Sequence, residues 1–161
     1  MDSRAIVRIA LPLGVPVTAQ TLGIILGPRH GALAVLLFLF VVLLGAPLLA
    51  GGRGGLGVLF APTMGFMLGF VPRAWVAGLV MARLKRLPVF AAALAVAIAS
   101  GIVVVYACGV AGLMAVARLS PWQALVAAAV FAPGDLLKAL LTAFVAQAAY
   151  RSYPSAIAKR S

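Results

Sequence analysis

Long apolar runs alternate along this chain with short segments that are rich in glycine, proline and arginine. The clearest run, residues 32–50, is about 19 residues long, which is enough for a helix to cross the apolar core of a bilayer. Runs at 63–84, 88–117 and 134–150 predict three further long helices, the first of them entered through Pro62 and kinked near Pro72. The pattern has no ten-residue alternation, so it does not predict a transmembrane barrel.

The remaining segments predict shorter or irregular elements. Pro12 and Pro16 interrupt the N-terminal run, and Pro133 interrupts the run that leads to the C-terminus, because proline removes a backbone donor and clashes with the preceding turn. In chain order we expect an irregular entry (1–16), a short helix (17–27), a turn (27–31), a glycine-rich loop (51–57) and a second short helix (121–131).

Small residues predict where the helices pack. Gly65 and Gly69 have the G-x-x-x-G spacing, which allows another backbone to approach closely. Between 88 and 117, six alanines recur at multiples of four positions and predict a helix-packing stripe: Ala91, Ala95, Ala99, Ala107, Ala111 and Ala115.

The composition places these helices in a membrane. The chain has 161 residues, of which 65% are hydrophobic and 9% are charged, and its mean hydropathy is +1.21. A soluble domain of this size needs far more polar surface. We therefore predict an all-α integral membrane protein, a single membrane domain over 1–161, built as a compact bundle of five to six transmembrane helices.

The net charge of +11 is distributed as in a membrane protein and not as in a nucleic-acid-binding protein. The basic residues lie in short loops between apolar runs, and such loops orient a chain by the excess of Lys and Arg on the cytoplasmic side. If the spans alternate, Arg53 and Arg118 fall on the outer side. Seven others fall on the cytoplasmic side together with the C-terminus: Arg29, Arg83, Lys85, Arg86, Arg151, Lys159 and Arg160.

Candidate chemistry centres on Asp135 and Lys138 in the last apolar run. Asp2 is the only other acid in the chain, so Asp135 is the sole acid of its body. Ionisable residues inside a membrane segment are expensive and point to function. Lys138 can offer its charge to a ligand carboxylate while Asp135 accepts N–H donors, and Thr142 lies on the same helix side. The alternative is a structural ion pair that holds two helices together.

Three further polar residues are candidates for the same site. Arg73 lies deep in its helix, where it either snorkels toward a headgroup or points into a cavity. Thr63 and Gln20 add neutral hydrogen-bonding groups toward the outer side. Cys108 and His30 have no ligating neighbours in sequence, so we expect no metal, no cofactor and no enzyme activity. No ATP-binding motif is present, so energy from ATP would need another subunit.

Five ordered segments of this chain resemble the BioY family, the biotin-capturing S components of energy-coupling-factor (ECF) transporters. The segments are 15–23 (VPVTAQTLG), 26–37 (LGPRHGALAVLL), 45–52 (GAPLLAGG), 62–70 (PTMGFMLGF) and 133–138 (PGDLLK). The resemblance covers about residues 12 to 150. It implies uptake of biotin across the bacterial cytoplasmic membrane, with a transmembrane T component and a pair of cytoplasmic ABC-type ATPases as partners.

The resemblance also implies a biotin pocket near the outer face. Asp135 and Lys138 match the family's pocket, with contributions from the loop around Gly52 and from the segment that holds Thr63 and Gly65. Biotin has a ureido group with two N–H donors for Asp135 and a carboxylate for Lys138. Gln20 and Arg73 complete the predicted substrate-binding set.

The chain departs from the family pattern near its N-terminus. Family members are similar in having a full first helix before the P-V-T-x-Q segment, with an Ala-x-x-x-Ala contact for the T component, and this chain has no match for it. We therefore expect a bundle that lacks the first helix. Two alternatives remain: an S component for another vitamin, and a small structural membrane protein whose Asp135–Lys138 pair only locks helices.

Overall fold

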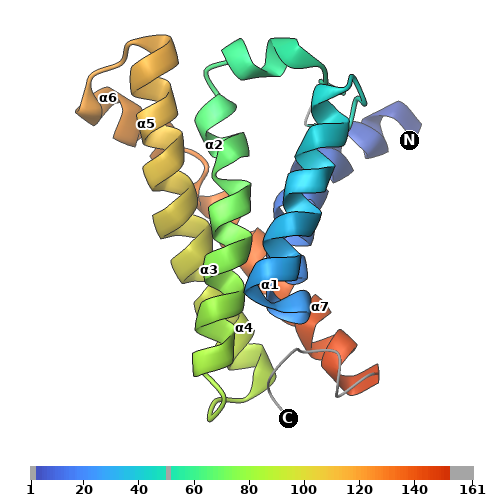
Figure 1. The fold of residues 1–161 in the computed structure, drawn as a ribbon. Helices are drawn as coiled ribbons and strands as arrows, with labels where there is room; N and C mark the ends of the chain where they lie inside the picture. The colour runs from blue at the N-terminus through green and yellow to red at the C-terminus, as the bar shows by residue number, and fades with distance from the viewer. Residues whose placement is uncertain (1–2, 50–51, 153–161) are drawn as a thin grey trace.

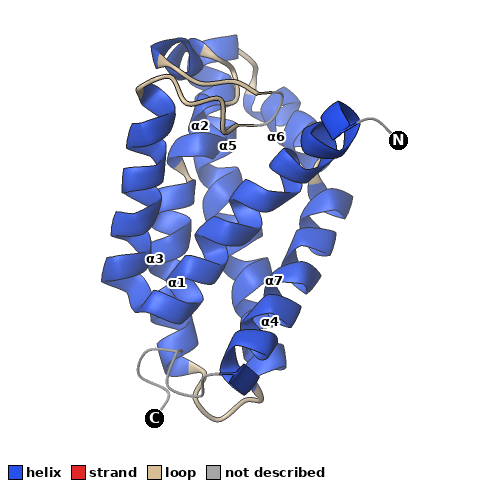
Figure 2. Cartoon of the chain, turned by 90° about the vertical axis from the view of Figure 1, so that its right-hand side faces the viewer, coloured by secondary structure: helices blue, strands red, loops and turns tan. Residues whose placement is uncertain are grey.

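The computed structural model describes residues 3–49 and 52–152, and side chains within these ranges from Val15 onward. The described residues form helices without strands (Figure 2), apart from one isolated antiparallel bridge between Leu49 and Arg53. The elements are α1 (Ser3–Leu43), the 3-10 helix η1 (Leu56–Phe60), α2 (Met64–Leu68), α3 (Phe70–Arg83), α4 (Val89–Ile98), the π-helix η2 (Ala99–Val104), α5 (Val105–Ala117), α6 (Pro121–Ala129) and α7 (Ala132–Ser152).

The α1 segment is a helical hairpin. Gly27 has φ 82° and ψ 177°, outside the helical region, and the chain reverses there (Figure 1). A Cβ placed on Gly31 would lie only 2.6 Å from the Cα of Gly23. In one straight helix these residues would be about 12 Å apart along the axis. The turn predicted at 27–31 is confirmed, and the two arms of α1 touch through their glycines.

Two predicted boundaries around α1 are wrong. The expected irregular entry at 1–16 is helical from Ser3, while Met1 and Asp2 lie outside the described residues. Each proline removes one backbone bond, but in an apolar medium an irregular backbone would leave many more groups unsatisfied. The helix expected over 32–50 ends at Leu43, because Gly45 takes φ 113° and Pro47 lacks a donor.

The other predicted spans are confirmed with local changes. Residues Met64–Arg83 form one apolar span that is interrupted at Gly69. The break follows from Pro72, whose ring crowds the carbonyl four residues earlier. Val89–Ala117 is a second span, and α6 and α7 form a pair bent by 52° near Pro133. By length and composition, three described helical segments qualify as membrane spans, or four if the bent pair is one span. The α1 segment qualifies only when both arms of its hairpin are counted together.

Glycines set the closest helix contacts. A Cβ on Gly65 would collide with the carbonyl of Cys108 and lie 2.8 Å from the Cα of Gly112, so α2 and α5 pack backbone to backbone as the G-x-x-x-G spacing predicts. The prediction that the alanine stripe packs against other helices of this chain is wrong. All six alanines are exposed, and the buried face of α4 carries Ala92, Ala93 and Val96 instead.

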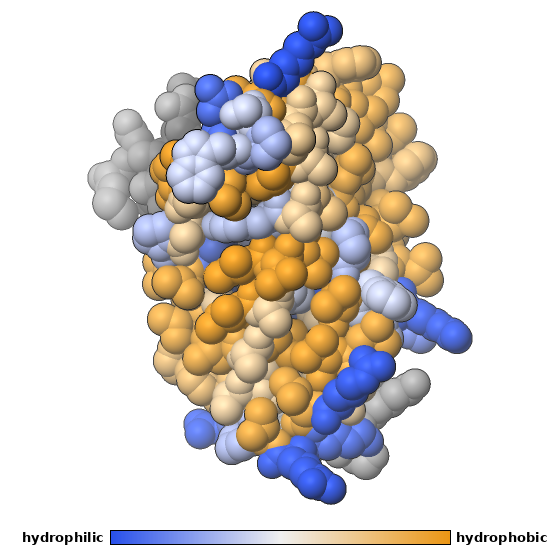
Figure 3. All heavy atoms as spheres, turned by 90° about the vertical axis from the view of Figure 1, so that its left-hand side faces the viewer, coloured by the Kyte–Doolittle hydropathy of each residue, from blue (hydrophilic) through white to orange (hydrophobic). Residues whose placement is uncertain are grey.

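The charged loops lie at opposite ends of the bundle. The turn of α1 with Arg29, the α3–α4 connection and the end of α7 lie at the lower end in Figure 1, and the loops with Arg53 and Arg118 lie at the upper end. Lys159 and Arg160 lie outside the described residues. Apolar side chains cover the middle of the face in Figure 3, and most hydrophilic ones gather toward its ends. This distribution suits a bundle that crosses a bilayer.

Candidate functional site

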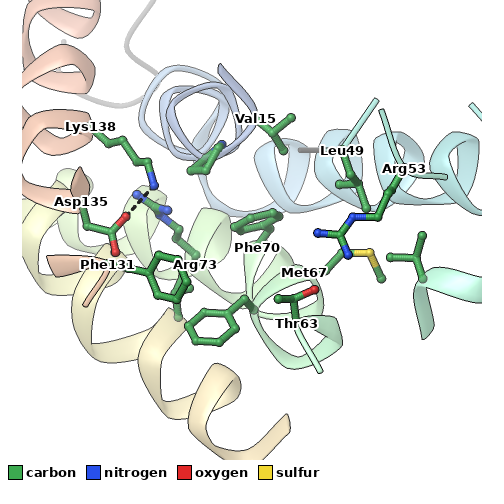
Figure 4. Close-up of a pocket in the computed structure, with 15 residues that line it drawn as sticks. Val15, Leu49, Arg53, Thr63, Met67, Phe70, Arg73, Phe131, Asp135 and Lys138 are labelled. Atoms are coloured by element: carbon green, nitrogen blue, oxygen red, sulfur yellow. Dashed lines mark hydrogen bonds and ion pairs between the residues drawn. The ribbon is translucent and has the colours of Figure 1, made fainter. Parts of the chain in front are cut away.

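A cavity of about 250 Å³ lies inside the bundle beneath the loop that joins α1 to α2. The loop contributes Leu49, Arg53 and Val58 to its lining, so the cavity lies toward the end of the bundle that carries Arg53 and Arg118. The lining is mostly apolar, and its polar side chains are Arg53, Thr63, Arg73, Asp135 and Lys138. Figure 4 shows Asp135, Lys138 and Arg73 gathered on one side of the cavity, with Thr63 and Arg53 on the other.

Asp135 is held by two donors. Lys138 Nζ donates to Asp135 Oδ1 at 2.8 Å, and the Tyr106 hydroxyl of α5 donates to Oδ2 at 2.7 Å. The two charged side chains retain 19% and 15% of their exposure, so both reach the cavity without being sealed from it. The ion pair joins two residues of one helix and therefore cannot lock two helices together. The bond from Tyr106 does connect α5 to α7.

Arg73 belongs to a second, fully buried polar network. Its Nη2 donates to Gln20 Oε1 on the first arm of α1. The other end of the Gln20 amide donates to Ser100 Oγ at 2.8 Å and to the Val96 carbonyl at 3.3 Å. Ser100 Oγ donates to the same carbonyl at 2.7 Å. These bonds join α1, α3 and the α4–η2 junction behind the cavity wall.

The guanidinium of Arg73 is short of partners. Arg73 is 5% exposed, and its Nε is buried without a hydrogen-bond partner. Within the described part of the chain its one hydrogen bond goes to Gln20, and the ion pair of Asp135 is with Lys138. Of the two alternatives for Arg73, snorkelling toward a lipid headgroup or pointing into a cavity, the structure shows the second. A buried donor without an acceptor is costly, and Asp135, the acid nearest to Arg73 in the cavity, is already paired with Lys138, which together favour an anionic ligand group beside Arg73.

Aromatic rings form one wall of the cavity. Phe66 packs edge-to-face on Phe131, with ring centroids 6.0 Å apart, and on Tyr106, with centroids 6.4 Å apart. A Cβ on Gly109 would overlap the Phe66 ring, so this glycine lets the ring lie directly on α5. The wall offers an apolar surface for a flat ring system next to Asp135.

The structure brings four of the seven predicted site residues to the cavity lining: Thr63, Arg73, Asp135 and Lys138. Gln20 lies behind the wall and contacts Arg73. Gly65 lies in the contact with α5, and Gly52, with φ 69°, lies in the exposed loop. Neither glycine is among the lining residues. Thr142 is buried and donates to the Lys138 carbonyl at 2.9 Å, so its hydroxyl serves its own helix.

The sequence interpretation missed Tyr106, Ser100 and Arg53. Tyr106 carried a signal, because a tyrosine inside an apolar run usually finds a partner for its hydroxyl. Ser100 and Arg53 carried no such signal. Ser100 is an isolated hydroxyl in an apolar run, and Arg53 is used in the sequence analysis only to orient the chain in the membrane.

The described residues hold no group of three His, Cys, Asp or Glu side chains that could bind a metal ion. The arrangement can instead bind an amphipathic molecule that has hydrogen-bond donors and an anionic group.

Comparison with known proteins identifies the family. The model of the BioY family matches residues 2–155. The biotin transporter BioY of Rhodobacter capsulatus is 44% identical over 167 residues, covering 94% of this chain and 88% of that protein. The biotin transporter BioY of Rhizobium etli is 41% identical over 154 residues, covering 87% and 80%.

A solved structure agrees with these relatives. The crystal structure of the S-component for biotin from an ECF-type ABC transporter matches with a TM-score of 0.77 and 27% identity, covering 84% of this chain and 73% of that one. The match confirms the predicted S-component-like helical fold. The relatives are named as transporters and not as enzymes, and the apolar helices make this chain a multi-pass membrane protein. The chain belongs to the BioY family.

Proposed function

We propose that this chain is the S component of an ECF-type transporter and that it captures biotin in the cavity beneath the α1–α2 loop. The proposal is supported by the names of the relatives and of the structural neighbour. The observation within the chain that carries it is the buried Arg73 guanidinium, which lies beside the Asp135–Lys138 ion pair at the cavity wall and whose Nε has no hydrogen-bond partner. The cavity volume of about 250 Å³ is slightly below the usual range for ligand pockets, about 300–1,000 Å³.

The chemistry of biotin suits the charged cluster of Asp135, Lys138 and Arg73 and the aromatic wall beside it. Asp135 is a carboxylate whose oxygens each hold one donor, so lone pairs remain for the N–H groups of the ureido ring. The aromatic wall of Phe66 and Phe131 can cover the apolar ring system. Lys138 and Arg73 then supply two positive charges for the carboxylate of biotin, and a carboxylate forms strong charge-assisted hydrogen bonds with such groups. Thr63, across the cavity, adds a neutral hydrogen-bonding group.

The proposal extends to orientation and partners. We place the chain in the bacterial cytoplasmic membrane with the C-terminus in the cytoplasm, because the loops with Arg29, Arg83 and Lys85 lie at the same end as the end of α7. The cavity then opens toward the outer side, where biotin arrives. Release inward would use a T component and ABC-type ATPases. The chain itself performs no covalent step.

A thermal-shift comparison tests the ligand. The purified chain in detergent is melted with biotin, thiamine or riboflavin, because a ligand that binds only the folded state raises the melting temperature. We expect a shift with biotin alone. A shift with another vitamin would assign the chain to that vitamin, and no shift with any of the three would favour a structural membrane protein.

A further inference from the structure

The hydrogen bonds of Gln20 fix which end of its amide faces Arg73. Both hydrogen bonds that Nε2 donates go to acceptors on the α4–η2 junction, the Ser100 hydroxyl and the Val96 carbonyl. An amide turned the other way would place its oxygen against that carbonyl. The Gln20 oxygen therefore faces the guanidinium, and the network has one consistent direction of donation.

The π-helix η2 shapes the seat of the guanidinium. Gly101 is buried in η2, and a Cβ there would lie 3.0 Å from Arg73 Nη2 and 3.4 Å from its Cζ. The guanidinium thus rests on a position that has no side chain. Single π-turns inside α-helices often occur at functional sites, because they displace the residues that follow. Here η2 holds both Ser100, which accepts a bond from Gln20, and Gly101, which lies against Arg73.

The partner of Arg73 is neutral, and this matters for its charge. An arginine has five N–H donors, and Gln20 takes up one of them. A glutamine oxygen can orient the guanidinium without cancelling its charge, whereas a glutamate at the same place would form an ion pair with it. The network therefore fixes the position of Arg73. Because Asp135 is paired with Lys138, the cluster of Arg73, Lys138 and Asp135 keeps one net positive charge at the cavity.

We infer that Gln20 and Ser100 are positioning residues that hold the Arg73 guanidinium on Gly101 as the seat for the carboxylate of the ligand. The inference rests on the proposed function and deepens it, because Gln20 and Ser100 contact no ligand themselves. It gives a positioning role to Gln20, the one hydrogen-bond partner of Arg73 among the described residues, and to the π-helix η2.

The test compares biotin with biotin amide, which has the same rings and chain but no carboxylate charge. Affinities for both are measured by titration calorimetry on the wild-type chain and on Gln20→Glu. The wild-type chain should bind biotin more tightly than the amide. The new carboxylate should pair with Arg73, so Gln20→Glu should lose about tenfold to hundredfold in affinity for biotin and much less for the amide, the range for a lost bond to a charged group.

Two further variants guard against misfolding of Gln20→Glu. Ser100→Ala removes one acceptor of the Gln20 amide, and Gly101→Ala pushes on the guanidinium, so both should show the same selective loss. Thr21→Val is the matched control, because the Thr21 hydroxyl donates to Val17 on its own helix, outside the network. It should leave both affinities unchanged.

The outcomes separate the inference from the proposed function. A loss that is equal for biotin and its amide, or no loss for either, would mean that the network is only structural and would overturn the inference. Wild-type binding that does not distinguish the two ligands would also overturn it, while the proposed function would stand. A wild-type chain that binds neither ligand would contradict the proposed function itself.

Discussion

Replacement of Lys138 by alanine should weaken biotin binding strongly while the chain stays folded. Lys138 donates to Asp135 at 2.8 Å and keeps 15% of its exposure at the cavity, so its ammonium can serve the ligand carboxylate and neutralise Asp135 at once. The substitution removes one charge-assisted bond to the ligand, worth about 1.5–3 kcal/mol, and leaves the Asp135 charge to repel the carboxylate.

Together these effects amount to about 2–4 kcal/mol of binding free energy, or roughly a thirtyfold to thousandfold rise in the dissociation constant. Titration calorimetry of the purified chain in detergent measures it directly. Lys85→Ala is the matched control, since Lys85 is an exposed lysine in the loop at the opposite end of the bundle. A Lys138→Ala affinity within about threefold of the control would refute the assignment of this residue to the site.

Three other predictions follow from the same geometry. Asp135→Asn should weaken biotin binding roughly tenfold in the same titration, because a charged acceptor is lost, and unchanged binding would favour a purely structural pair. Gly65→Leu should lower the melting temperature by collision with the backbone of α5, whereas Gly134→Ala, with open space around the new methyl, should not lower it. In a cysteine-free background, an impermeant thiol reagent outside the cell should label Arg118→Cys and not Lys85→Cys, and the reverse pattern would contradict the proposed orientation.

The sequence predicted the features that depend on local patterns. The long apolar runs became the spans, and the Gly27–Pro28 pair became the reversal of α1. The short helix predicted at 121–131 is α6, Pro121–Ala129, and Ser120 caps it with reciprocal bonds to Gln123 that were not predicted. Asp135 and Lys138 stood out because two charges in an apolar run are costly unless they serve a purpose.

Features that depend on the rotation of each helix about its axis were not predictable. Lipid is as apolar as the interior of the bundle, so alanines occur on both faces, and the stripe from Ala91 to Ala115 gave no sign that it points outward. The contact between Arg73 and Gln20 spans 53 positions, and the contact between Tyr106 and Asp135 spans 29. Such pairs follow from the packing of whole helices and leave no short-range pattern.

Equilibrium binding of labelled biotin to the purified chain in lipid nanodiscs tests the central claim most directly. The chain should bind biotin saturably by itself, with one site per chain, and excess unlabelled biotin should displace the label while thiamine and riboflavin do not. Labelled biotin that remains at the level of empty nanodiscs, or that unlabelled biotin does not displace, would contradict the claim that this cavity is a biotin site.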